Sequence, residues 1–243
     1  MEISDNYEWV DLPSEGQCYH VDSPLRCGKI KIGYLTAKDE NILMSGNTEI
    51  NDIIISKKIV DKTINPSILV NGDRNAILLW LRKTSYGNNF NITVRNNNEN
   101  EIYDTNIDLS LIKNKVFTLV GNKDGHFMYF TKNNDVLHFK YLTYNDLNRF
   151  EHDNFSDEKN VKDFTTEFLK LITVSVNGND DRKFVDEYIE NLSFNEKFFY
   201  ISFVEDNKPD IDNNVTLNIS KKEKNTLTKV LLLIDNTFLI NLE

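Results

Sequence analysis

The sequence has few of the residues that build covalently held or metal-bound structures. Its 243 residues include only 2 cysteines, 4 prolines, 9 glycines and 4 histidines. Cys18 and Cys27 allow at most one disulfide, half of a metal site, or two unrelated thiols. The N-terminus is acidic and lacks the basic, apolar leader of an exported protein, so we expect free thiols in a reducing cytosol.

Long apolar runs are also missing. The longest candidate, Val230–Ile234, has the length of a strand, far below the ~20 residues of a transmembrane helix. There is no internal repeat and no low-complexity tract. Hydrophobic residues still make up 40% of the chain, which is enough for a real core. We therefore expect a soluble, globular protein without a membrane span.

The charge balance disfavours nucleic acid as a partner. There are 38 acidic and 28 basic residues, which gives a formal net charge of -10. A chain of this charge repels phosphate backbones.

Motifs for catalysis and cofactor binding are absent from the sequence. There is no Gly-x-Ser-x-Gly element, and Gly72 alone does not make a phosphate-binding loop. In so acidic a chain, neighbouring carboxylates are expected on solvated faces. Cys18, His20 and Cys27 leave open a zinc site without an evident fourth ligand. We predict no catalytic, cofactor-binding or metal-binding residues.

A central helix is the strongest structural signal, over Ser67–Phe90. Asn71 and Asp73 could cap its first turn, the run Ala76–Leu81 is apolar on all sides, and Gly87 marks its end. Asp73 and Arg74 lie in the first turn of this helix. We expect Asp73 to interact with the helix dipole and Arg74 to form a structural ion pair.

Two shorter helices and an extended arm are predicted before it. Residues 1–35 read as an arm with a strand near 27–35. Thr36 and Asp39 form a capping-box pattern, which starts a helix that ends near Gly46. Apolar residues then recur at helical spacing over 50–64, and Pro66 prevents continuation.

Alternating patterns follow the central helix. They predict strands at 90–94 and 116–120, and a hairpin from 126–130 and 136–141 in which His126 and His138 could face each other. The polar stretch 143–160 is a flexible connection or a poorly packed helix.

The C-terminal third mixes helices and strands. Amphipathic helices are predicted at 161–176 and 180–192, separated by a turn at 177–180, and a further apolar segment covers 194–204. Residues 215–219 alternate as a strand, the basic run 221–224 reads as a solvated loop, and 230–242 could form two strands or add to the sheet.

The predicted fold class is α+β, with an arm and helical cluster, a middle antiparallel sheet, and C-terminal helices with strands. We place one region at 1–142, a linker at 143–160, and a second region at 161–243 that could belong to the same domain.

Two segments, 31–47 and 68–94, resemble a protein family of T4-like contractile-tailed phages, whose members are baseplate hub subunits or hub assembly proteins. The first segment matches a Leu-Thr-x-Lys-Asp-Glu pattern, and the second a Gly-Asp-Arg helix that ends in Ser-Tyr-Gly. Ile107, Asp108 and Leu109 are similar to the family's continuation into a strand region. A cysteine pair found after the helix in many relatives is absent here, so no metal is implied. The matching residues are Leu35, Thr36, Lys38, Asp39, Glu40, Ile42, Gly72, Asp73, Arg74, Ala76, Leu79, Arg82, Ser85, Tyr86 and Gly87.

The resemblance implies a non-enzymatic protein that contacts other phage baseplate or tail proteins, in the virion or in the host cytoplasm during assembly. It also implies structural or interface roles for Asp39, Glu40, Asp73, Arg74, Arg82 and Tyr86. We expect Asp39 or Glu40 to pair with Arg74 or Arg82, which would fasten the first helix to the central one.

Two alternatives stay open. The protein could be a transient assembly chaperone for a hub or tape-measure protein, absent from the mature virion. It could also be a baseplate-associated hydrolase, which would need Asp39, Glu40 and Asp73 to converge in a cleft. The oligomeric state is not determined by the sequence.

Overall fold

The computed structural model describes residues 6–45, 49–96, 101–155, 163–220, 225–235 and 238–240. These residues form helices and small antiparallel sheets, so the predicted α+β class is confirmed. The helices are α1 Ala37–Leu43, α2 Ile50–Lys58, α3 Asn71–Tyr86, α4 Tyr144–Phe155, α5 Phe164–Ile172, α6 Arg182–Asn191 and α7 Phe194–Asp206. The strand pairs are β1 Tyr7–Asp11 with β2 Lys29–Gly33, β3 Asn89–Asn96 with β4 Glu101–Asp108, and β8 Asn214–Ser220 with β9 Asn225–Leu231. A further sheet has the order β5 Phe127–Phe130, β6 Val136–Phe139, β7 Thr173–Val176.

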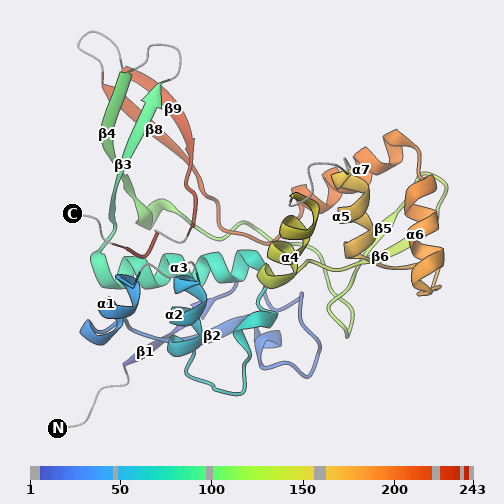
Figure 1. Cartoon of the computed structure of the whole chain (residues 1–243), viewed down its shortest axis with the longest axis horizontal. Coiled ribbons are helices and arrows are strands. Elements are labelled where there is room, and N and C mark those ends of the chain that lie inside the picture. The colour runs from blue at the N-terminus through green and yellow to red at the C-terminus, as the bar shows by residue number, and fades with distance from the viewer. Residues whose placement is uncertain are drawn as a thin grey trace.

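Helix α3 lies at the centre of one half of the molecule. Figure 1 shows α1, α2 and the β1–β2 pair on one side of it and the hairpins β3–β4 and β8–β9 rising from the other. All residues from Gly72 to Leu79 are buried, as the apolar run predicts. Gly87 ends the helix at a positive φ of 82°, and its N–H donates to the Lys83 carbonyl, which confirms the predicted end.

The predicted start of α3 is wrong in its detail. Val70 is the N-cap residue, and no side chain caps the first turn. Asp73 does not bond to the helix end because its carboxylate accepts hydrogen bonds from the N-terminal arm instead.

The described residues pack around two apolar cores. The first surrounds α3 and includes residues from both ends of the chain, among them Ile30, Leu217 and Phe238. The second lies between the β5–β6–β7 sheet and helices α5, α6 and α7. Cys18 and Tyr141 pack against both cores, so the two halves are in contact. The region boundaries drawn from the sequence stay a prediction.

Most predicted strands are present. The strand in the arm is β2, the strand after α3 is β3, and the strand near residue 217 is β8. The predicted hairpin is β5–β6, but its register places Met128 opposite His138. His126 and His138 therefore do not face each other, and the His138 ring lies 3.2 Å from the Ser175 hydroxyl of β7.

Two predicted helices are too long. Helix α2 ends at Lys58 because Ile59 forms a β-bridge with Ile32 and the Val60 N–H donates to the Lys31 carbonyl. Helix α5 ends at Ile172, and the next four residues form β7 beside β6. In both cases an apolar run that fits a helix also fits a buried strand, and pairing with the sheet decides between them.

Three further predictions are corrected. Residues 116–120 make no strand, although their pattern alternates. The stretch 143–160 contains helix α4, which agrees with the helix alternative. This helix is not poorly packed, because Phe150 is buried against the rings of Phe164 and Phe168. Residues 156–160 lie outside the described residues. Val230 and Leu231 add to a sheet as the end of β9, which was one of the predicted alternatives. Residues 232–235 and 238–240 form no strand, and the carbonyl groups of Asp235 and Ile240 accept hydrogen bonds from α2 and α3. The end of the first helix at Gly46 and the loop 221–224 lie outside the described residues.

Candidate functional site

Asp39 fastens α1 to α2. Its side chain is fully buried, and its carboxylate accepts hydrogen bonds from the Thr36 N–H (2.7 Å) and the Thr36 hydroxyl (2.8 Å). Lys57 Nζ lies 2.6 Å from one carboxylate oxygen and Lys58 Nζ contacts the other. Burial alone would raise the pKa of Asp39, but the two lysines and Thr36 hold this pKa well below its usual range. Glu40 is exposed on the same helix.

Asp73 fastens the N-terminal arm to the start of α3. Its buried carboxylate accepts hydrogen bonds from the Ser14 N–H (2.9 Å), the Ser14 hydroxyl (2.6 Å) and the Tyr19 hydroxyl (2.5 Å). Burial raises the pKa of Asp73 to about 6, and these hydrogen bonds offset the burial only in part. Asp210 adds to the rise because its carboxylate lies nearby.

Gly72 allows the segment 209–210 to pass close to α3. A Cβ atom at this position would lie 1.9 Å from the Pro209 carbonyl oxygen and 2.8 Å from the Asp210 Cα. Asn75 reaches the same segment, since its amide donates to Asp210 Oδ1 at 3.1 Å. The Gly-Asp-Arg element therefore holds the arm on one side and the segment 209–210 on another.

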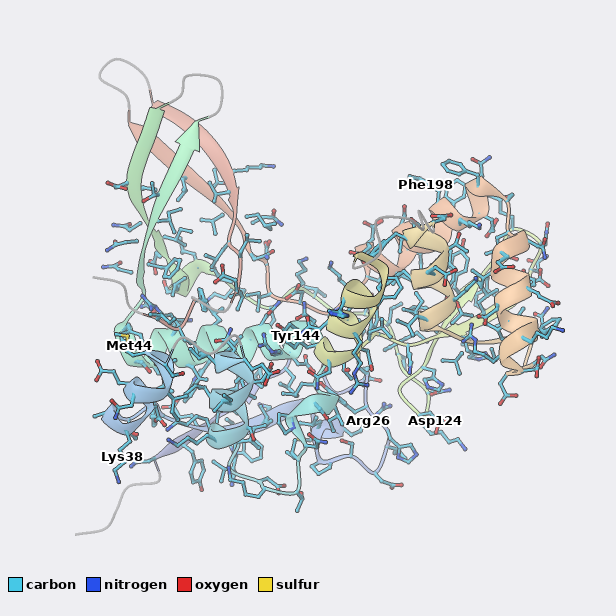
Figure 2. The ribbon with its side chains drawn as sticks, in the orientation of Figure 1. Arg26, Lys38, Met44, Asp124, Tyr144 and Phe198 are labelled. Carbon is cyan, nitrogen blue, oxygen red and sulfur yellow. The ribbon has the colours of Figure 1, made fainter. Side chains whose placement is uncertain are left out.

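Arg74 joins three helices. Its Nε donates to Asp52 of α2 at 3.0 Å, and its guanidinium group lies 3.7 Å from the centre of the Tyr144 ring, at the start of α4. Figure 2 labels Tyr144 at the end of α3 that faces α4. The arginine is only 3% exposed, so its charge is enclosed between an acid and an aromatic face.

Arg82 and Tyr86 lie together near the other end of α3. The Arg82 guanidinium group stacks over the rings of Tyr86 (4.5 Å) and Phe90 (5.1 Å) and donates to the Ile240 carbonyl at 3.2 Å. Tyr86 remains 37% exposed. Arg82 thereby holds the C-terminal segment against α3.

The expected pairing of Asp39 or Glu40 with Arg74 or Arg82 is wrong for Asp39 and Arg74. Asp39 pairs with the two lysines at the end of α2, and Arg74 pairs with Asp52 at its start, so α2 stands between the helices that were expected to pair. The predicted ion pair of Arg74 itself is confirmed. Sequence reasoning missed Ser14, Tyr19 and Asp210, because nothing in their local sequence shows that they meet α3.

The acidic cleft that the hydrolase alternative requires is not found in the described residues. Asp39 is enclosed by Thr36, Lys57 and Lys58, whereas Asp73 contacts the arm. A cavity of about 270 Å³ lies between the two halves, lined at one side by Gly72 and Asp210. Its Lys208 and Glu205 side chains pair with each other at 2.7 Å, so they neutralise each other.

The described residues contain neither a cluster of metal ligands nor a membrane-spanning helix. Among the described residues, no three His, Cys, Asp or Glu side chains are placed to hold a metal ion. Both cysteines are free, as expected. Burial raises the pKa of the Cys18 thiol well above its usual value, and the Cys27 thiol donates to the Pro24 carbonyl. No helix in these ranges has both the length and the apolar character needed to cross a bilayer.

These residues hold the arm, the helices and the C-terminal segment together. Neither a curated protein nor a solved structure matches the chain. A family model described as T4 bacteriophage base plate protein does match, over residues 4–232. Because this match spans most of the sequence, the chain belongs to the family of T4 bacteriophage base plate proteins.

Proposed function

We propose that this baseplate protein acts in the central hub of the baseplate, as a structural subunit that works through contacts with other phage proteins. The observation that carries the proposal is that the charged residues of the two hub-like segments, 31–47 and 68–94, make internal contacts. Helix α1 lies within the first segment and α3 within the second, and Asp39, Asp73 and Arg74 of these helices are buried in internal contacts. Side chains used in this way support a rigid scaffold and take no part in catalysis.

The surface supports a role in protein–protein contacts. Phe194 and Phe198 lie one turn apart on α7 and are 84% and 58% exposed. Figure 2 shows Phe198 on the part of the molecule farthest from α1. Exposed aromatic side chains of this kind mark surfaces that a partner covers.

Quantitative mass spectrometry of purified phage particles tests the proposal. A structural hub subunit is expected in every particle at a fixed copy number relative to the other baseplate proteins. The alternative, a transient assembly chaperone, predicts the chain in infected cells and its absence from purified particles. That absence would reject the structural role.

The hub position needs a separate measurement. Particles assembled with a tagged chain should show the tag on the central axis of the baseplate by electron microscopy. A tag at the periphery would contradict the hub proposal while leaving the family assignment intact.

A further inference from the structure

Residues 116–120, Val-Phe-Thr-Leu-Val, follow a path without helix, turn or bend, and their side chains alternate between core and solvent. Phe117 is buried, and its ring meets Phe127 edge-on with the ring centres 5.7 Å apart. Val116 and Val120 point outward and are 89% and 81% exposed. This alternation is that of a strand with one face on a core.

The backbone of this segment has no partner within the described residues. No N–H or carbonyl group of 116–120 takes part in a hydrogen bond with the rest of the described chain. Bonds resume at once on either side, from the Lys115 N–H to the Asp210 carbonyl and from the Asn122 N–H to the His126 carbonyl. Toward the described part of the chain, the segment thus presents free donors and acceptors, as an edge strand does.

Both ends of the segment are held in place. Before it, the Asp212 N–H donates to the Lys113 carbonyl at 2.7 Å. After it, Arg26 donates to the Gly121 carbonyl at 3.1 Å, and the Gly121 N–H donates to the Gln17 side chain at 3.2 Å. Because the ends are fixed, little conformational entropy remains to be lost when a partner binds.

We propose that residues 116–120 are a docking edge to which an extended segment of another phage protein adds as a β-strand. The main-chain groups would supply the hydrogen bonds, and Val116 and Val120 would pack against alternate side chains of the added strand. No charge lies within the five residues, so they suit an apolar strand.

Charge argues against a second copy of this chain as the occupant. If the segment paired antiparallel with itself about Thr118, Lys113 would face Lys123 at both ends of the pairing. Like charges in opposite positions destabilise a strand pair. Lysines at 113, 115 and 123 instead favour a strand flanked by acidic residues.

Site-specific photo-cross-linking in phage-producing bacteria tests the docking edge. A photoreactive amino acid replaces Thr118 in the full chain and, as a matched control, Met44. Both positions are exposed, and Figure 2 shows Met44 beside α1, far from Asp124 in the loop after the docking edge. We expect an adduct from position 118 that maps to one segment of one phage protein, and no such adduct from position 44.

Two further substitutions make the test specific. Val116→Lys with Val120→Lys should lower the yield of the adduct about tenfold or more, because two apolar contacts are replaced by charges. Met44→Lys should leave the yield unchanged. All three side chains are exposed, so the thermal unfolding of the variants should match that of the wild type.

Several results would overturn the docking edge. They are an adduct with a second copy of this chain, equal adducts from positions 118 and 44, or no adduct at all. Slow amide exchange at residues 117–120 in the isolated protein would also overturn it, because the edge would then already be paired. The proposal rests on the family assignment and not on the hub position. A chain absent from particles would reject the structural subunit and leave this docking edge standing.

Discussion

The carboxyl group of Asp73 lies out of contact with water and has no cation among the donors that surround it. Its pKa is raised from the usual 3.8 to about 6. A raised pKa in the folded state means that folding favours the protonated form. The stability that protonation gives is complete below pH 4 and is lost as the pH rises through 6.

The variant Asp73→Asn is therefore expected to remove this pH dependence. The free energy of unfolding of the wild type, relative to that of Asp73→Asn, should fall by roughly 2 kcal/mol between pH 4 and pH 7. Urea denaturation at several pH values measures this difference. Asp180→Asn, at an exposed position, is the matched control for the removal of one carboxylate. A flat difference for Asp73→Asn would show that its carboxyl titrates normally.

Two glycines at the ends of α3 are needed for different reasons. Gly72→Ala should cost about 3 kcal/mol or more of unfolding free energy, because the new methyl group meets the backbone of Pro209. Gly87→Ala should cost only about 1 kcal/mol, because its Cβ enters open space and the cost comes from the positive φ alone. Urea denaturation of both variants shows which substitution lowers the unfolding free energy more. Equal losses would mean that the 209–210 segment moves away at little cost.

At the scale of elements, α2 is the connector of the helical cluster. Its last turn holds Asp39 of α1 through Lys57 and Lys58, and its first turn holds Arg74 of α3 through Asp52. The α1–α2 contact is a buried ion pair, so removing one partner leaves an uncompensated charge.

Asp39→Asn is expected to lower the unfolding free energy at pH 7 by about 2–4 kcal/mol. Its neighbour Glu40 is exposed, so Glu40→Gln should change the value by less than about 0.5 kcal/mol. Chemical denaturation of the two variants compares them directly. Because the pKa of Asp39 is lowered, its contribution is present above pH 4 and fades as the pH falls below that value. Similar effects of both substitutions would mean that Asp39 is not buried in solution.

At the scale of the whole molecule, the C-terminal segment packs against the N-terminal half of the chain. Phe238 is buried in the first core, and its ring lies 5.2 Å from that of Phe90. Asn51 of α2 donates to the Asp235 carbonyl, so the last described residues are held by the N-terminal helices. The first core is therefore incomplete without the C-terminal segment.

Phe238→Ala should reduce the unfolding free energy by about 3–5 kcal/mol, since it empties a site in a packed core. Phe194→Ala removes the same ring from an 84% exposed position and should have little effect on the isolated protein. Thermal unfolding of the two variants tests the closure. If Phe238→Ala were as mild as Phe194→Ala, the C-terminal segment would not belong to the core.

The sequence by itself determined the elements whose signals are local. The capping box at Thr36, the apolar run in α3, its end at Gly87 and the β5–β6 hairpin all depend on neighbouring residues, so pattern and propensity were sufficient. The resemblance carried by α1 and α3 also led to the correct family, because its motifs are local.

Only the tertiary structure decided what depends on distant partners. The end of α2 and the strand β7 are set by the strand edge that each segment meets. The lack of a backbone partner for residues 116–120 among the described residues is likewise a property of the folded chain. The same holds for the partners of Asp39, Asp73 and Arg74, since Ser14 and Asp73 are 59 residues apart in the chain. Charges can be read from a sequence, but which of them meet depends on how the elements pack, and packing brings together residues that no local pattern connects.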